Sequence, residues 1–256
     1  IASRVLSEVT GSWFESSWDE KEQIYRISGA TLKNAIDARL AGLKQKSGTG
    51  TMLKGSMTKE FPSTLAAAIV QPGGKGLLAD FLWSGDSRVY VLDEQGLKQV
   101  SVDDLPVTDA MENLRQDAGM NNVVSASHPY QINVRKLKLD QPCIIFAATD
   151  GCFGYLRTPM EFEKLLLSTL LSSESIVQWQ NALDEQFRNI AGDDYTMSLM
   201  SVGYGSFRKL KESCEKRYRY MERVYPLLPD TSEQELFRQW AVYRPDYEIY
   251  QKRDET

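Results

Sequence analysis

Aspartates stand at two places where an apolar stretch meets a turn. Asp150 follows the apolar run 143–149, and Asp193 and Asp194 directly precede another such run, 195–202. Carboxylates held at strand ends suit a hard divalent cation, and oxygen-only ligation selects magnesium, manganese or calcium over zinc or copper. Taken alone, the local pattern favours structural roles, with Asp150 as a helix N-cap and the aspartate pair as a turn.

A third candidate is the segment Gly85-Asp86-Ser87-Arg88 between two predicted strands. A tight hairpin explains it, with the Asp86 side chain bonding backbone amides and Arg88 pairing with a carboxylate. Gly-Asp-Ser also marks one class of esterases with a serine nucleophile. That chemistry would require Ser87 to lie within hydrogen-bond reach of His128, the single histidine of the chain. An esterase serine would also follow an early strand of a parallel sheet, whereas an antiparallel hairpin is expected here.

Histidine and cysteine usage narrows the chemistry further. One histidine excludes any mechanism that needs two histidine ligands, and the three cysteines show no zinc-site spacing and no disulfide framework. This usage predicts a reduced, cytoplasmic protein. Cys152 and Arg157 form a C-x₄-R pattern, one residue short of the C-x₅-R phosphate cradle of cysteine-dependent phosphatases.

The elements that position these residues can be predicted from periodicity and turn signals. Strands group in the middle of the chain and helices group on either side of them, and the strands are joined by tight turns. This arrangement predicts an α+β fold with helices packed on antiparallel sheets or a sandwich. We expect helices at 1–14, 31–46, 158–171 and 173–190, and strands at 63–70, 77–84, 88–92, 97–100, 132–139, 143–149 and 197–202.

The chain after Gly205 is expected to be helical. It carries two stripes of apolar and aromatic residues at spacings of three and four, and its first helix is rich in lysine and arginine. One interpretation is a helix pair that closes over a sheet face; the other is a docking arm for a partner, steered by its basic face. We therefore divide the chain into residues 1–204 and a helical C-terminal extension, 205–256.

Composition excludes several classes of protein. The chain has 256 residues, is 42% hydrophobic and carries a formal net charge of -5. A mildly acidic chain argues against nucleic acid as the main partner, because phosphate binding needs a basic face. The longest apolar runs are too short to cross a bilayer, so no membrane association is expected.

Four motifs in order resemble the PP2C family of metal-dependent serine/threonine phosphatases. The family has a Gly-Asp-Ser-Arg turn, a later Ser/Thr-Asp-Gly at a strand end, and Asp-Asn or Asp-Asp before its last strand. This chain has 85–88, then Thr149-Asp150-Gly151, then Gly192-Asp193-Asp194, and its Ser63-Thr64-Leu65 resembles the Thr-rich start of the preceding family strand. The resemblance covers roughly residues 1–204 and not the C-terminal helices.

The resemblance implies a β-sandwich flanked by helices, with two Mn²⁺ or Mg²⁺ ions in a cleft at the sheet edge. Such an ion pair activates a hydroxide and clamps the phosphoryl group, so no side-chain nucleophile is needed. By the resemblance, Asp150 and Asp193 match metal ligands, Asp194 is the residue after a ligand, and Asp86 is mainly a structural residue of the turn. The implied substrate is a protein phosphorylated on serine or threonine, and a cognate Ser/Thr kinase is a candidate partner.

One departure from the family pattern is large. The family's first acidic motifs, Glu-Asp on an early strand and Asp-Gly-x-Gly before the first helix, have no match between Ile1 and Gly55. Asp19 and Glu20 are acidic neighbours in an expected loop, and we do not assign them as ligands. We expect the missing motif to lie upstream of Ile1. The alternative is a catalytically inactive domain of the same fold that binds a phosphoprotein or regulates a kinase.

Overall fold

The computed structural model describes residues 2–46, 61–74, 76–115 and 119–252, and it contains two antiparallel sheets packed face to face. The first sheet has the strand order β3-β4-β7, the second has the order β6-β5-β8-β9, and a small hairpin joins β1 to β2. The strands are β1 (Trp18–Asp19), β2 (Ile24–Tyr25), β3 (Leu65–Gly73), β4 (Gly76–Ser84), β5 (Arg88–Asp93), β6 (Gly96–Gln99), β7 (Asn133–Leu139), β8 (Cys143–Ala148) and β9 (Met197–Val202).

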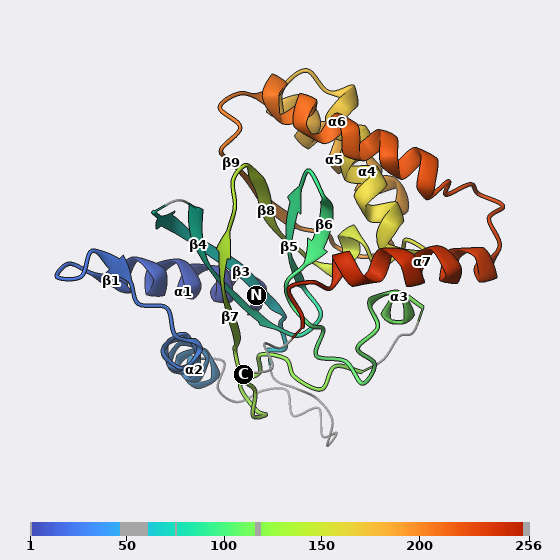
Figure 1. The fold of residues 1–256 in the computed structure, drawn as a ribbon. Helices are drawn as coiled ribbons and strands as arrows, with labels where there is room; N and C mark the ends of the chain where they lie inside the picture. The colour runs from blue at the N-terminus through green and yellow to red at the C-terminus, as the bar shows by residue number, and fades with distance from the viewer. Residues whose placement is uncertain (1, 47–60, 75, 116–118, 253–256) are drawn as a thin grey trace.

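Helices cover the outer face of each sheet (Figure 1). α1 and α2 lie beside the first sheet, and α4 to α7 lie beside the second, which gives four layers. The predicted α+β fold, an antiparallel sandwich flanked by helices, is therefore confirmed. The helices are α1 (Ala2–Ser16), α2 (Gly29–Lys46), α3 (Ala110–Asn113), α4 (Pro159–Ser172), α5 (Ile176–Ile190), α6 (Phe207–Val224) and α7 (Glu233–Tyr247).

Most helix starts follow from capping chemistry. The side chains of Thr158, Ser175, Ser206 and Ser232 each accept a hydrogen bond from a backbone N–H in the first turn of the helix that follows. Such caps satisfy N–H groups that have no partner within the helix. The predicted helix 173–190 begins three residues later than expected because Ser175 takes the cap position.

The segment 85–87 differs from the predicted hairpin. β4 belongs to the first sheet and β5 to the second, so Gly85, Asp86 and Ser87 carry the chain across the sandwich. Gly85 has a φ of +94°, and a Cβ there would lie 2.7 Å from the Thr64 methyl group. Both observations require glycine at this position. The crossing places the next residue, Asp86, partly buried at the edge of the sandwich instead of in a ladder.

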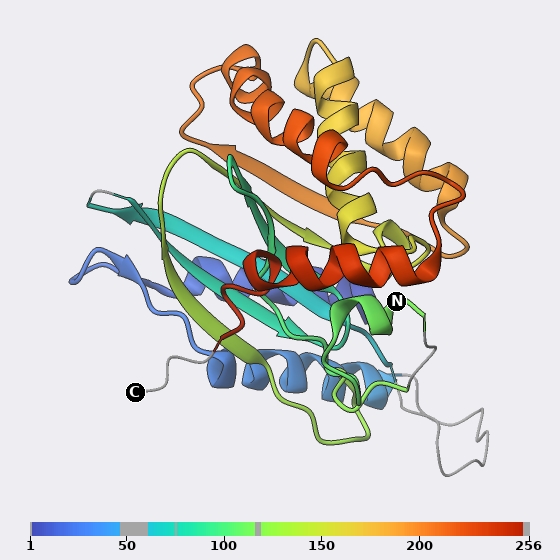
Figure 2. The same ribbon diagram turned by 45° about the vertical axis from the view of Figure 1, so that its right-hand side comes forward.

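Three apolar clusters hold these layers together. One lies under α1 and α2, one lies between the sheets, and the largest lies between the second sheet and α4 to α7. The apolar stripes predicted after Gly205 point into this largest cluster, through residues such as Cys214 and Trp240. The boundary at residue 204 stays a prediction. Figure 2 shows α7 lying across the end of the second sheet, next to α3.

No helix in the described part of the chain combines the length and the apolar character needed to span a bilayer. Residues 47–55, a glycine- and threonine-rich segment expected to end the second helix, lie outside the described residues.

Candidate functional site

Asp86 and Asp150 line one cavity at the edge of the sandwich. The cavity has a volume of 330 Å³, and Asp103, Arg88 and Phe153 also form its wall. Asp86 comes from the segment that crosses between the sheets, and Asp150 follows the central strand β8. Two segments that are more than sixty residues apart thus bring carboxylates to one solvent-filled space.

Strand pairing positions Asp150. β8 pairs with β9 up to Ala148 opposite Met197. The ladder continues for one residue beyond the strands, because the Thr149 N–H donates to the Thr196 carbonyl oxygen at 3.0 Å. The Thr149 Oγ1 accepts from the Thr196 N–H at 2.9 Å. The strand end is therefore fixed, and the Asp150 side chain emerges exposed just beyond it.

Gly151 allows the second acidic segment to approach. A Cβ on Gly151 would lie 2.4 Å from the Asp194 carbonyl oxygen, which no side chain could tolerate. The predicted motifs Thr149-Asp150-Gly151 and Gly192-Asp193-Asp194 therefore lie against each other. The close approach of the Asp194 backbone explains why the residue after Asp150 is a glycine.

The Asp193 side chain is exposed and turned toward its own backbone. Its Oδ1 accepts from the Asp194 N–H at 2.7 Å, and Asp193 does not line the cavity of Asp86 and Asp150. The structure brings the two segments together, but it leaves the Asp193 carboxylate in the turn role that the local pattern favoured. The assignment of Asp150 and Asp193 as metal ligands stays a prediction.

Asp86 belongs to the site more directly than the sequence indicated. Burial, and then the negative charge of Asp150, raises the pKa of Asp86 to about 6. A carboxyl group that titrates this close to neutrality can carry or accept a proton under physiological conditions. The motif 85–88 did single out Asp86 in the sequence. We assigned it a structural role because we expected a hairpin there.

A buried ion pair forms the rear wall of the cavity. The guanidinium of Arg88 donates to Asp103 through Nε at 3.0 Å and through Nη2 at 2.6 Å. The Arg88 guanidinium lies over the Phe153 ring, 4.3 Å from its centre. Gln99 and Asn113 also donate to Asp103, at 3.0 and 3.1 Å. The carboxylate partner predicted for Arg88 is thus confirmed, and its identity as Asp103 was missed because no local spacing links the two residues.

The carboxylates fit a hard cation only in part. Asp150 presents an exposed carboxylate, and its only described hydrogen bond is the one that Oδ1 accepts from the Gly151 N–H at 3.0 Å. Oxygen donors of this type suit Mg²⁺ and Mn²⁺. Within residues 2–46, 61–74, 76–115 and 119–252, however, no group of three acidic, histidine or cysteine side chains is arranged to hold a metal ion. The acidic side chains of the described residues therefore do not form a complete metal centre, and a metal-binding role for Asp150 stays a prediction.

The structure contradicts the esterase chemistry. The Ser87 hydroxyl is buried and lies 2.6 Å from the Thr64 hydroxyl, whereas the exposed His128 pairs through Nδ1 with Ser127 at 2.8 Å. The residues described show no contact between Ser87 and His128. Burial also raises the pKa of the Cys152 thiol to about 12, which excludes it as a nucleophile.

Asp19 has a structural role, which agrees with our decision not to assign it as a metal ligand. Its Oδ1 accepts from the backbone N–H groups of Lys21 and Glu22, at 2.9 and 3.1 Å, within the β1–β2 hairpin. The predicted loop of residues 15–22 therefore contains a short strand as well as a turn.

Comparisons with known proteins give the fold and no closer relationship. No family model and no curated protein matches the chain. A bacterial serine phosphatase is similar, with a TM-score of 0.58 and 17% identity over 78% of this chain and 79% of that one. The phosphatase MsPP of Mycobacterium smegmatis, in complex with cacodylate, has a TM-score of 0.54 and 15% identity over 78% and 80% of the two chains. The catalytic domain of the serine threonine phosphatase PstP, in complex with two manganese ions, has a TM-score of 0.52 and 16% identity over 78% and 79%. The chain therefore has the PP2C-like α+β fold.

Proposed function

We propose that this protein is a metal-dependent phosphatase that hydrolyses phosphoserine and phosphothreonine in proteins. The observation that carries the proposal is the Asp150 carboxylate, which stands exposed at the end of β8 beside Asp86 on the cavity at the sandwich edge. The PP2C-like fold and the order of the four motifs support the same assignment.

Asp150 and Asp193 are the proposed ligands for divalent cations, Mn²⁺ or Mg²⁺. Bound cations of this kind would supply an activated water and neutralise the charge of the phosphoryl group. In this chain, the steric fit of Gly151 against Asp194 holds the two acidic segments together. The pair of Arg88 and Asp103 stiffens the wall behind Asp86. The two nucleophile candidates considered, Ser87 and Cys152, are both buried, which agrees with water as the attacking group.

The test is hydrolysis of p-nitrophenyl phosphate and of a phosphothreonine peptide, with Mn²⁺ and with EDTA. We expect activity that depends on Mn²⁺ and that falls at least about a hundredfold in Asp150→Ala and in Asp193→Ala. The matched control is Asp140→Ala, because Asp140 is exposed in the turn that precedes the same strand β8, at its opposite end. Equal activity in the unsubstituted protein and all three variants would contradict the ligand assignment.

A second candidate function is a catalytically inactive domain that binds a phosphoprotein or regulates a kinase. It is favoured by one observation, that the acidic side chains of the described residues do not complete a metal centre. The two functions separate cleanly. A folded protein with no turnover in Mn²⁺ or Mg²⁺, but with saturable binding of the phosphothreonine peptide, would support the inactive domain.

The remaining assignments belong to the same proposal. The partners are a phosphorylated protein substrate and a cognate Ser/Thr kinase, with neither nucleic acid nor membrane involved. The proposed location is the cytoplasm, which agrees with Cys143, Cys152 and Cys214 all being free thiols.

A further inference from the structure

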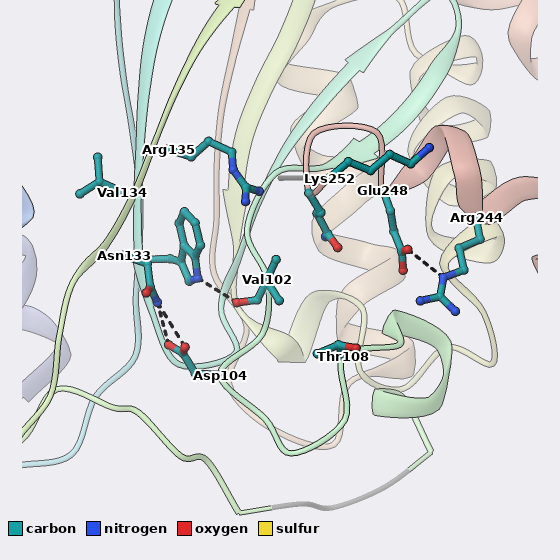
Figure 3. Close-up of a pocket in the computed structure, with 11 residues that line it drawn as sticks. Val102, Asp104, Thr108, Asn133, Val134, Arg135, Arg244, Glu248 and Lys252 are labelled. Atoms are coloured by element: carbon teal, nitrogen blue, oxygen red, sulfur yellow. Dashed lines mark hydrogen bonds and ion pairs between the residues drawn. The ribbon is translucent and has the colours of Figure 1, made fainter. Parts of the chain in front are cut away.

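A second and larger cavity lies on the other side of the segment that carries Asp103. It has a volume of 580 Å³ and lies between β7, residues 102–108 and the chain at the end of α7 (Figure 3). Asp103 lines the first cavity and the adjacent Asp104 lines this one, so the two spaces are separate neighbours. The volume falls in the range of small-molecule sites.

Arg135 brings an uncompensated positive charge into this second cavity. Its guanidinium extends from β7 toward the C-terminal segment (Figure 3), donates to the Val100 carbonyl oxygen at 2.5 Å, and lies 5.6 Å from the centre of the Trp83 ring. Arg135 is partly buried, and no carboxylate of the described residues forms an ion pair with it. Burial lowers the pKa of Arg135, as expected for a cation without a counter-ion.

The other charged groups of the cavity do not neutralise Arg135. Asp104 already accepts hydrogen bonds from the Gly85 N–H, from Asn122 and from Asn133, at 2.9, 2.7 and 3.1 Å. The Glu248 Oε2 accepts from the Arg244 Nε at 2.8 Å. Lys252, also on the wall, adds a further positive charge. An anion entering the cavity would therefore meet a guanidinium that has no carboxylate partner in the described part of the chain and that donates one hydrogen bond to the Val100 carbonyl oxygen.

Glu248, on the opposite wall, has one carboxylate oxygen without a partner in the part of the chain that the structure describes. Its Oε1 is buried and forms no hydrogen bond among the described residues. An unpaired buried polar atom is unfavourable and calls for an explanation. The cavity thus has a cation on β7, and Glu248 at the end of α7 holds an unsatisfied oxygen just beneath the wall.

We infer that this cavity binds a small anion that carries a phosphate or carboxylate group and a hydrogen-bond donor. The anionic group would pair with the Arg135 guanidinium, a geometry that guanidinium supports with two parallel hydrogen bonds. The donor, a hydroxyl or an amine, would pair with Glu248 Oε1 once that side chain turns toward the cavity. This site is distinct from the proposed phosphatase centre and does not depend on it.

Titration by calorimetry in EDTA tests the inference with two probes, orthophosphate and glycolate. Each probe carries an anionic group and a hydroxyl donor, so the two arms distinguish phosphate from carboxylate recognition. The titration is made in EDTA, which removes any contribution from bound metal, and the Arg135 variants show which part of the signal comes from this cavity. A failure of the phosphatase proposal would therefore leave this result unaffected.

We expect saturable binding of one probe, with affinity reduced at least about tenfold by Arg135→Gln and less by Arg135→Lys, which keeps the charge. The control is Arg208→Gln, an exposed arginine on α6 far from the cavity in sequence and absent from its wall. The Nε1–H of Trp83, which donates to the Val102 carbonyl oxygen at 2.8 Å, supplies an NMR signal at the cavity wall. Its chemical shift should move with the same dissociation constant.

Two outcomes would overturn the inference. One is the absence of saturable binding of either probe at concentrations up to about 20 mM, a very weak affinity for a charge-paired site. The other is equal affinity in the Arg135→Gln protein. Melting curves of each variant confirm that it is folded. If Arg135→Gln does not fold, the Trp83 Nε1–H signal of the unsubstituted protein decides, because an unchanged signal during saturable binding would place the probe elsewhere.

Discussion

Asp86 illustrates how a single carboxyl group links the site to stability. Its pKa in the folded protein is raised to about 6 from the ordinary 3.8, by burial first and by Asp150 second. A group whose pKa is higher in the folded state stabilises the fold most below its unfolded pKa. That contribution is lost as the pH rises from about 4 to 6, because the folded state must then hold an ionised carboxylate in a partly buried place.

We therefore predict that Asp86→Asn stabilises the protein at pH 7.5 and has little effect at pH 4. The expected gain is on the order of 2 kcal/mol in the free energy of unfolding, measured by urea denaturation in EDTA at both pH values. The control is Asp140→Asn, an exposed carboxylate. The same difference at both pH values would show that Asp86 titrates as an ordinary aspartate.

The cysteines give a second prediction at the residue scale. Burial raises the pKa of Cys143 to about 11, and of Cys152 and Cys214 to about 12. Because the thiolate is the reactive form, the native protein should resist iodoacetamide at pH 8 and react fully in urea, as counted by mass spectrometry. Cys152→Ser should leave the proposed phosphatase activity unchanged. Rapid labelling of the native protein would contradict the buried positions.

At the scale of elements, the packing of α6 against α4 depends on one buried carboxylate. Glu163 of α4 is fully buried and accepts from Arg217 at 2.6 and 3.0 Å and from the Tyr243 hydroxyl at 2.5 Å. Most other basic residues of α6 are exposed, and two of them, Arg208 and Arg219, pair with Glu212 and Glu215 of the same helix. The helix packs against Glu163 through Arg217, and its outer face keeps an excess of basic residues.

Arg217→Met is expected to lower the free energy of unfolding by about 3–5 kcal/mol, because it leaves Glu163 buried without its counter-ion. Arg208→Met on the same helix is the matched control, and an exposed pair of this kind contributes about 0.5 kcal/mol or less. Urea denaturation monitored by circular dichroism gives both values. Similar losses in the two variants would show that α6 does not pack as described.

The elements could be predicted from the sequence far better than their connections. Periodicity placed β8 and the turn that precedes β6 correctly, because alternation and turn residues are local signals. The crossing at Gly85 was taken for a hairpin, since the same glycine serves a tight turn or a change of sheet and only the partner strand decides between them. This one difference explains why Asp86 was assigned to the turn and missed as part of the candidate site.

At the scale of the whole molecule, contacts between distant residues had no sequence signal. The Tyr247 hydroxyl donates to Gln99 Oε1 at 2.8 Å, across 148 residues, and Gln99 in turn donates to Asp103 beside the candidate site. Arg244 of α7 pairs with Asp109, the N-cap of α3, at 2.5 Å. The apolar stripes alone could not decide between a docking arm and a closing helix pair, because aromatic residues at helical spacing suit an interface as well as a core.

Removal of residues 205–256 tests how far the molecule depends on these contacts. The truncated chain would expose the apolar cluster that α6 and α7 cover, including the partners of Trp240 and Tyr243. It would also leave Glu163 without Arg217 and Tyr243. We predict that residues 1–204 bind the dye ANS and unfold without a cooperative transition, whereas the full chain unfolds cooperatively. A well-dispersed NMR spectrum and a sharp melting transition for residues 1–204 would instead identify the C-terminal helices as a separable unit, and would restore the docking arm as the better interpretation.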